Sequence, residues 1–310
     1  MIRKHQPPAI VFFLFLLILF LLSDKTFAAT NKINGTIQKA FFKETHMQMT
    51  FSFHMSRDSI IETPNFELPL ARNETVAGLR AARIKNLKYL PVNPAKIFPN
   101  LLRYDASTSS VFSIARNNFQ GLKKLKVLML RRNEISILAH DSFTDLIALQ
   151  ELLLNDNKIR ELDARIFENL PNLRELNIAE NQLESLPEHV FANLIDLNEI
   201  DLSTNELKTL NEKIFMNNLK LIKVLVNHNK INKLSATMFA DKKRLIAVGL
   251  VENECVDDFY SQSDLERMKI EIGENCEHFN GTIVRHNRSI EIRSVKKQPS
   301  FSKYSLKWEK

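Results

Sequence analysis

The sequence is poor in residues that several kinds of functional site require. Only six glycines occur among 310 residues, which argues against a glycine-built phosphate-binding loop. Two cysteines cannot form the dense disulfide framework of a small secreted scaffold. No H-E-x-x-H or G-x-S-x-G motif occurs, and the eight histidines are scattered along the chain. We therefore predict that the protein is not an enzyme, with no catalytic residues, no metal site and no cofactor.

Basic residues are concentrated at the two ends of the chain. Residues 281–310 hold eight Lys or Arg against two Glu, and residues 1–28 hold three against one Asp. The stretch between them is nearly neutral, although the whole chain has a formal net charge of +7. The basic segment fits either a solvated tail or an attachment to an acidic partner or a sulfated glycan. We expect no nucleic-acid partner.

The only long apolar run lies near the start of the sequence. Arg3 and Lys4 precede an apolar stretch at residues 9–22, which is shorter than the roughly 20 residues that a membrane-spanning helix needs. Small residues follow, and Ala28 suits a cleavage site, so residues 1–28 read as a secretory signal peptide. An uncleaved anchor is the alternative. We expect a secreted, extracellular chain with no membrane span after cleavage.

Four N-x-[ST] sequons agree with secretion, and all lie outside residues 77–254. The candidate glycosylation sites are Asn34, Asn73, Asn280 and Asn287.

A repeat of 24 residues runs through the middle of the chain. Each unit reads L-x-x-L-x-L-x-x-N-x-I/L-x-x-L and continues to a Phe. The asparagines are Asn133, Asn157, Asn181, Asn205, Asn229 and Asn253. The phenylalanines are Phe119, Phe143, Phe167, Phe191, Phe215 and Phe239. Two ladders with one spacing and one phase indicate a repeat architecture.

The repeat resembles the leucine-rich repeat family in its 24-residue extracellular type, over residues 77–254. The resemblance implies a solenoid with a curved parallel β-sheet on the concave face and an irregular, Phe-packed convex side. It implies about seven repeats plus caps. The setting is similar to insect secreted leucine-rich repeat proteins and to Toll-type receptor ectodomains without the membrane span. Such proteins act in innate immunity, development or adhesion.

The recurring asparagine has a structural explanation. In the L-x-L strand the two leucines point inward, and the chain must then turn with backbone N–H and C=O groups inside. An inward Asn offers donors and an acceptor to those groups. An unmet buried group costs about 1–3 kcal/mol. We therefore interpret the asparagine ladder as structural.

Three units depart from the pattern. Ser109 stands at the Asn position of the unit that starts at Leu101. In the unit starting at Ala77, Lys85 holds that position and Arg80 an inward Leu position, which predicts a distorted first coil. In another unit Asn218 replaces the closing Leu, and we expect Leu219 to shift inward instead.

Caps are expected at both ends of the stack. Residues 29–76 form the N-terminal cap, where residues 49–55 alternate in polarity and predict a strand that pairs with the first coil. No cysteine pair stabilises this cap, although related families often have one.

The C-terminal cap covers residues 255–280, with a predicted Cys255–Cys276 disulfide over a short helix. Ser263 and Glu266 have capping-box spacing, and the helix presents an apolar stripe. That stripe consists of Leu265, Met268 and Ile272.

Outward strand positions are free to vary, so they are the candidate binding residues. These candidates are Arg131, Arg132, Glu151, Asp156, Glu175, Glu180, Glu199, Asp201, Lys223 and His228. Glu151, Glu175 and Glu199 are predicted to form a column on adjacent strands. This column either binds a basic partner surface or has no binding role, because Glu is common at this position in repeats of the family.

Two functions remain open. The first is a secreted, non-enzymatic binding module that recognises a protein or glycan through its concave face, in innate immunity or extracellular signalling. The alternative is an extracellular matrix or adhesion protein organised through the scaffold and the basic tail at residues 281–310. The identity of the ligand and the oligomeric state do not follow from the sequence.

Overall fold

The computed structural model describes residues 34–43, 46–54, 78–80, 89–90, 92–96 and 98–277. These residues belong to one compact unit, Met1–Phe279. The predicted signal peptide at 1–28 and the basic tail at 281–310 lie outside the described residues. So do three of the sequons, Asn73, Asn280 and Asn287. The fourth, Asn34, is the first residue of a strand.

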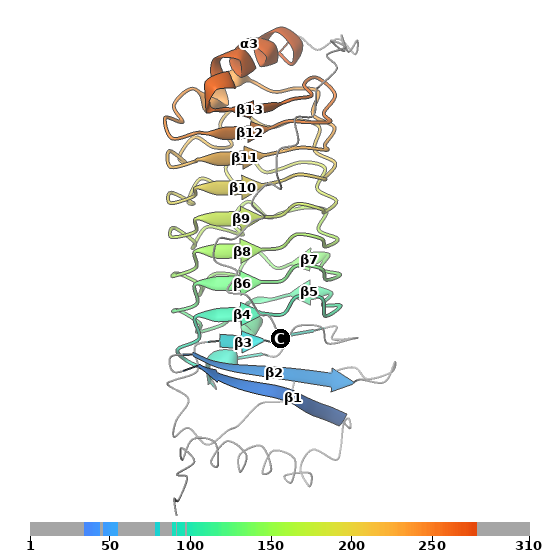
Figure 1. Ribbon diagram of the computed structural model, residues 1–310, viewed down its shortest axis with the longest axis vertical. Helices are drawn as coiled ribbons and strands as arrows, with labels where there is room; N and C mark the ends of the chain where they lie inside the picture. The colour runs from blue at the N-terminus through green and yellow to red at the C-terminus, as the bar shows by residue number, and fades with distance from the viewer. Residues whose placement is uncertain are drawn as a thin grey trace, which may run out of the picture. The chain divides into compact units, whose positions relative to one another are not determined.

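The coils form a leucine-rich repeat solenoid in which each coil adds one short strand to a parallel sheet (Figure 1). The parallel strands in sheet order are β3 (Gly78–Arg80), β4 (Arg103–Asp105), β6 (Val127–Met129), β8 (Glu151–Leu153), β9 (Glu175–Asn177), β10 (Glu199–Asp201), β11 (Lys223–Leu225) and β12 (Ala247–Gly249). From β4 to β12 the paired residues lie 24 positions apart, as the repeat predicts.

Antiparallel strands close both ends of the sheet. β1 (Asn34–Lys43) pairs with β2 (His46–His54), which pairs in parallel with β3. β2 corresponds to the strand predicted at residues 49–55, whereas β1 was not predicted. At the other end β13 (Phe259–Ser261) runs antiparallel to β12.

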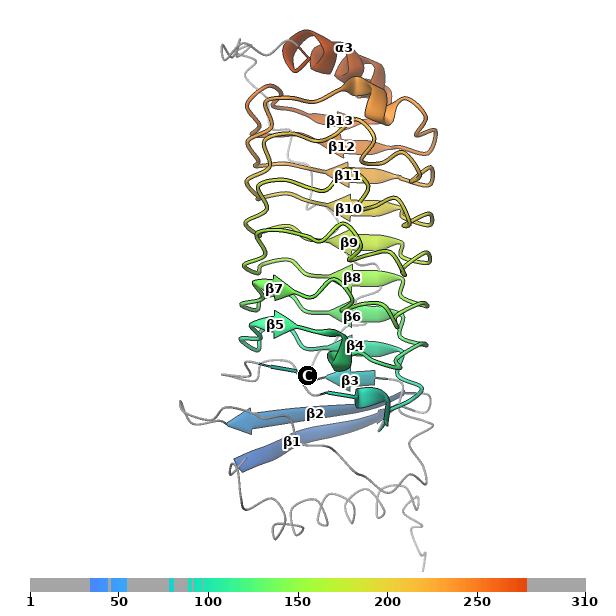
Figure 2. The same cartoon turned by 180° about the vertical axis from the view of Figure 1, so that it is seen from behind.

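The return side of the coils is irregular, with short elements that Figure 2 shows from behind. β5 (Ser113–Ile114) and β7 (Ile137–Leu138) form a second, two-stranded sheet. The 3-10 helices among the described residues are η2 (Pro94–Lys96), η3 (Arg116–Asn118), η4 (Ala236–Phe239) and, directly before the C-terminal helix, η5 (Gln262–Asp264).

A column of phenylalanines fills the core on this return side. Rings from Phe119 to Phe215 stack at centroid distances of 5.9–6.3 Å, each one coil from the next. The leucines of the strand side are fully buried opposite them. The Phe-packed side inferred from the sequence is therefore confirmed.

The asparagines bridge adjacent coils through their side-chain amides. Asn181 donates from Nδ2 to the carbonyl of Ile178 in its own coil and to that of Leu154 in the preceding coil, both at 3.1 Å. Its Oδ1 accepts from the N–H of Ile159 at 3.0 Å. The same three contacts recur at Asn133, Asn157, Asn205, Asn229 and Asn253.

The residue before each ladder position adopts a left-handed backbone, with φ of 53–59°. These residues are Thr108, Arg132, Asp156, Glu180, Thr204, His228 and Glu252. Such a conformation costs a non-glycine residue about 1–2 kcal/mol. It recurs in these seven coils because the turn must bring the next side chain inward, and in six of them the asparagine amide there compensates for the cost.

The first coil differs from its predicted frame by one residue. β3 pairs Leu79 with Tyr104 and Arg80 with Asp105, a separation of 25 rather than 24. Leu79 therefore takes the inward register position that was predicted for Arg80. Lys85 lies outside the described residues.

The expected inward shift of Leu219 does not occur. Asn218 is fully buried at the closing position, and Leu219 is 54% exposed. Asn218 donates to the carbonyls of Phe191 at 2.9 Å and Leu194 at 2.8 Å, so its amide replaces the leucine without any shift of the backbone. Its Oδ1 is buried without a hydrogen-bond donor.

The C-terminal cap consists of the helix α3 (Leu265–Asn275) and the disulfide between Cys255 and Cys276. The predicted stripe packs on the last coil, with Met268 and Ile272 fully buried and Leu265 partly buried.

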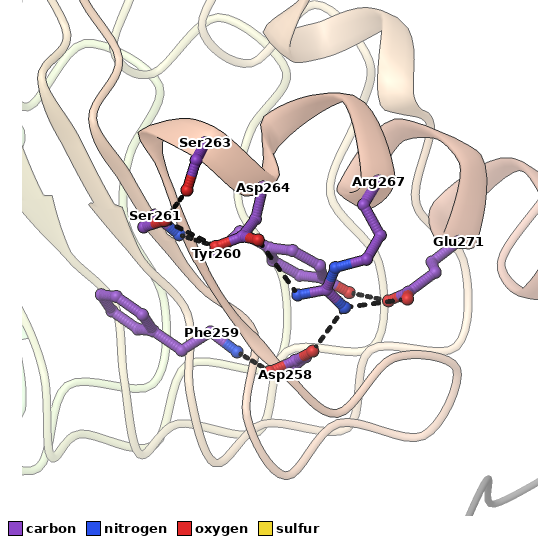
Figure 3. Close-up of polar contacts among 8 residues, drawn as sticks. All are labelled: Asp258, Phe259, Tyr260, Ser261, Ser263, Asp264, Arg267 and Glu271. Carbon is purple, nitrogen blue, oxygen red and sulfur yellow. Dashed lines mark hydrogen bonds and ion pairs between the residues drawn. The ribbon is translucent and has the colours of Figure 1, made fainter. Parts of the chain in front are cut away.

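Polar contacts of the helix tie it to β13 (Figure 3). Arg267 contacts Asp258 at 2.7 Å and Glu271 at 2.9 Å, and its guanidinium lies 4.9 Å from the centre of the Tyr260 ring. The predicted Ser263–Glu266 capping box is wrong. The contact instead joins Ser261 to Asp264, because a 3-10 turn precedes the helix and moves the cap upstream.

Removal of one ladder amide should destabilise the stack strongly. Asn181→Ala leaves backbone groups in two coils without a partner, so we expect the free energy of unfolding in urea to fall by about 2–4 kcal/mol. Asn172→Ala, which removes an exposed asparagine bonded to the Ile147 carbonyl, should cost less than about 0.5 kcal/mol. Equal losses in the two variants would contradict the structural role of the ladder.

A second substitution should stabilise the protein. Asn218→Leu removes a buried oxygen without a donor and restores the leucine that other coils carry at this position. We expect a gain of about 1 kcal/mol in the free energy of unfolding. Asn217→Leu, at the exposed neighbouring position, is the control and should give no gain. A loss of stability in Asn218→Leu would show that its two donated hydrogen bonds outweigh the orphaned oxygen.

Candidate binding surface on the strand face

Three-residue strands present two residues outward and one inward. The middle residue of each strand, such as Leu152 or Leu176, is fully buried. The first and third residues lie on the opposite side, because side chains alternate along a strand. We call the surface formed by these residues of β4 to β12, with the turns that follow, the strand face.

The first residues of successive strands form one column. From β4 to β12 they are Arg103, Val127, Glu151, Glu175, Glu199, Lys223 and Ala247. The pairing brings the three predicted glutamates into direct register, about 4.8 Å apart from strand to strand. We call these three residues the glutamate column. Arg103 and Lys223 stand on either side of it along the sheet.

Arg103 was not among the predicted site residues. It holds the same place in its unit as the three glutamates hold in theirs, and that offset could have identified it. Burial raises the pKa of Glu151, and the charges of Arg103 and Arg131 oppose this rise.

Glu175, at the centre of the column, is the most perturbed carboxyl. Burial and the charges of Glu151 and Glu199 raise its pKa to about 7, opposed by Lys223. Its Oε1 is buried without a hydrogen-bond donor. The centre of the column is thus a partly buried carboxyl group, one oxygen of which has no hydrogen-bond donor among the described residues.

An apolar patch adjoins the column. Val127, Met129 and Leu153 form a small cluster of their own on β6 and β8, separate from the main core. They are 6–8% exposed. The strand face therefore places aliphatic side chains beside Glu151.

Asp201 has a structural role that the sequence analysis missed. Its Oδ1 accepts from the N–H of Ser203 at 2.9 Å, which secures the turn after β10. Asn177 and Asp105 make the same contact with the residue two positions on. Burial raises the pKa of Asp201, and its hydrogen bonds with Ser203 and the positive charge of Lys223 oppose this rise.

The remaining candidates lie after the strands rather than in the column. Arg131 directly precedes the left-handed turn residue Arg132, and Asp156, Glu180 and His228 hold the same turn position in later coils. Arg132 pairs with Asp156 at 3.5 Å.

His228 contacts Glu252 at 2.8 Å through Nδ1. Exposed pairs of this kind contribute about 0–1 kcal/mol. The turn residues thus form an edge of mixed charge next to the glutamate column.

No group of three His, Cys, Asp or Glu side chains is arranged to hold a metal ion within the described part of the chain. Among the same residues, no helix has the length and apolarity to cross a bilayer.

Comparisons with known proteins agree with this architecture. The family profile described as "Leucine rich repeat" matches residues 107–159 and 147–207. The chain is a leucine-rich repeat protein. Among solved structures 368 chains match it, and one of these is the crystal structure of a TLR13–ssRNA13 complex.

The likeness to the TLR13 structure concerns the fold. The TM-score is 0.54 at 24% sequence identity, over 61% of this leucine-rich repeat chain and 26% of the other. The chain thus spans about a quarter of the length of that receptor chain. The RNA in that complex is a ligand of TLR13 and is not thereby a ligand of this chain. The sequence matches no curated protein.

The raised pKa of Glu175 predicts a pH dependence of stability. The folded state holds a proton up to about pH 7, whereas an unfolded Glu releases it near pH 4.5. The resulting stabilisation is present below the unfolded pKa and is lost as the pH rises through 7. The free energy of unfolding should therefore fall relative to that of Glu175→Gln between about pH 5 and 8.

Glu184→Gln, on the other side of the same coil, controls for the loss of one exposed charge. Parallel pH profiles for the native chain and Glu175→Gln would contradict the perturbed carboxyl.

Proposed function

We propose that this leucine-rich repeat protein is a secreted, non-enzymatic binding module whose strand face recognises a basic protein surface. The deciding observation is the glutamate column with an unsatisfied carboxylate oxygen at Glu175. A buried carboxylate is costly unless it is paired. A lysine or arginine of a partner would place a positive charge beside the partly exposed carboxyl group of Glu175.

The chemistry of the column favours a protein over a glycan. Sulfated glycans and nucleic acids are polyanions, and three aligned glutamates repel them. A protein can present lysine or arginine side chains to the three glutamates, which a polyanion cannot. Arg103 and Lys223 would exclude partners whose cations extend beyond the column.

A role in innate immunity or extracellular signalling rests on two supports. The first is the predicted signal peptide at residues 1–28. The second is the fold likeness to TLR13 in its complex with ssRNA13. The acidic strand face argues that this chain does not share that ligand. The alternative, a matrix or adhesion protein, depends on the basic segment at residues 281–310.

The glutamate column can be tested with matched triple variants in the same three coils. The column variant is Glu151→Gln, Glu175→Gln and Glu199→Gln. The control is Glu161→Gln, Glu184→Gln and Glu212→Gln, which removes three exposed carboxylates elsewhere. Both are compared with the native chain in affinity capture from extracellular fluid, followed by titration of the captured partner at low and high salt.

We expect the column variant to bind the captured partner at least about tenfold more weakly, with a smaller salt dependence. The control variant should bind as the native chain does. Equal binding by all three proteins would remove the column from the binding surface. Capture that depends on residues 281–310 and not on the column would favour the matrix role.

A further inference from the structure

A second surface runs along the edge where the chain enters each strand. The turns there lie on the left of the stack in Figure 1. We define the entry edge as the two residues before each unit's first leucine and the one residue after it, between Lys123 and Ile246. Strand pairing at 24-residue intervals places equivalent residues of this edge in rows, about 4.8 Å from coil to coil.

One row of the entry edge is aliphatic and exposed. Ile147, Ile195 and Leu219 are 49%, 53% and 54% exposed, and the exposed Pro171 lies between the first two. Lys123 and Lys243 hold the same position in the coils at either end. The backbone thus accepts a lysine at this position, and the fold does not require an aliphatic residue there. Ile246, at 48% exposure, extends the apolar surface beside Lys243.

Cations surround this apolar row. The entry edge holds seven Lys or Arg and one carboxylate, a net charge of +6 on a part of the sequence that is otherwise nearly neutral or acidic. The cations are Lys123, Lys124, Lys126, Arg174, Lys220, Lys243 and Arg244. The carboxylate, Asp196, contacts Lys220 at 2.5 Å. Cations therefore cluster at both ends of the row, with half-exposed aliphatic side chains between them.

We infer that the entry edge docks on a membrane surface rich in anionic phospholipid, with the aliphatic row inserted between the headgroups. Cations near such a surface attract it, and shallow insertion of aliphatic side chains adds to the binding. The proposal concerns a surface separate from the glutamate column and does not depend on the proposed partner of the strand face.

The aliphatic row favours a membrane over other anionic partners. Nucleic acids and sulfated glycans use the cations of a binding site and leave aliphatic side chains in water. The apolar area of the row is on the order of 300 Å², well below the roughly 800 Å² per partner of a stable protein interface. A second copy of the chain would also bring lysines at the row's ends close to lysines. A bilayer needs neither a large area nor a complementary shape.

Vesicle binding tests the inference with two variants of the full chain. The apolar variant is Ile147→Ser, Ile195→Ser and Leu219→Ser. The charge variant is Lys123→Gln, Lys124→Gln, Lys243→Gln and Arg244→Gln. Each is measured by co-sedimentation with phosphatidylcholine vesicles that contain about 30% phosphatidylserine or none. The cations of residues 281–310 are common to all the proteins, so they cancel in the comparison.

Control variants change similar exposed residues elsewhere on the protein, on the coils and on α3. The apolar control is Ile137→Ser with Ile270→Ser, at 54% and 61% exposure. The charge control is Lys158→Gln, Lys208→Gln, Lys230→Gln and Lys233→Gln, all exposed. Circular dichroism and the urea midpoint establish that each variant is folded.

We expect the native chain and both controls to bind only the phosphatidylserine vesicles. The charge variant should bind them about 100-fold more weakly, and the apolar variant about tenfold more weakly. Unchanged binding by the apolar variant would overturn the inference, because it would reduce the entry edge to a general polyanion site. So would a native chain that binds heparin or single-stranded RNA but no phosphatidylserine vesicle.

Discussion

The side-chain amide of one asparagine in each coil from β6 to β12 is the interaction on which the rest of the structure depends. It satisfies backbone groups in two coils at once, so neither coil forms the same turn without the other. The turn has a left-handed residue just before the asparagine, and the amide contacts offset that cost. Since each coil contacts only its neighbours, the stack is held together by a series of equivalent local bonds.

Strict repetition of this contact aligns the residues that occupy one position of the repeat into a row on the surface. Because each coil copies its neighbour's backbone, residues at one offset in the repeat become a row on the molecule. One offset gives the glutamate column on the strand face, and another gives the aliphatic row of the entry edge. The two rows carry opposite charge environments, which the nearly neutral composition of the repeats conceals. The same scaffold can therefore support two contacts of different chemistry.

The sequence predicts whatever follows from this repetition. The asparagine contacts, the stacked phenylalanines and the disulfide between Cys255 and Cys276 all come from residue type and spacing. It fails where a coil departs from the repeat, because the competing arrangements differ by one residue. Thus Leu79 holds the register position expected of Arg80, and Leu219 stays exposed because a buried amide could fill the closing position.

The candidate surface, too, was predictable from the sequence only in part. Register was predictable, whereas the desolvation of Glu175 depends on how closely its neighbours pack, which no pattern of residue types specifies.

Hydrogen exchange of individual backbone amides tests the ladder most directly. The N–H groups of Ile135, Ile159, Leu183 and Leu207, each bonded to an asparagine Oδ1, should exchange as slowly as those of the central strands. Exchange at the rate of exposed turn amides would show that the asparagines do not hold the coils together.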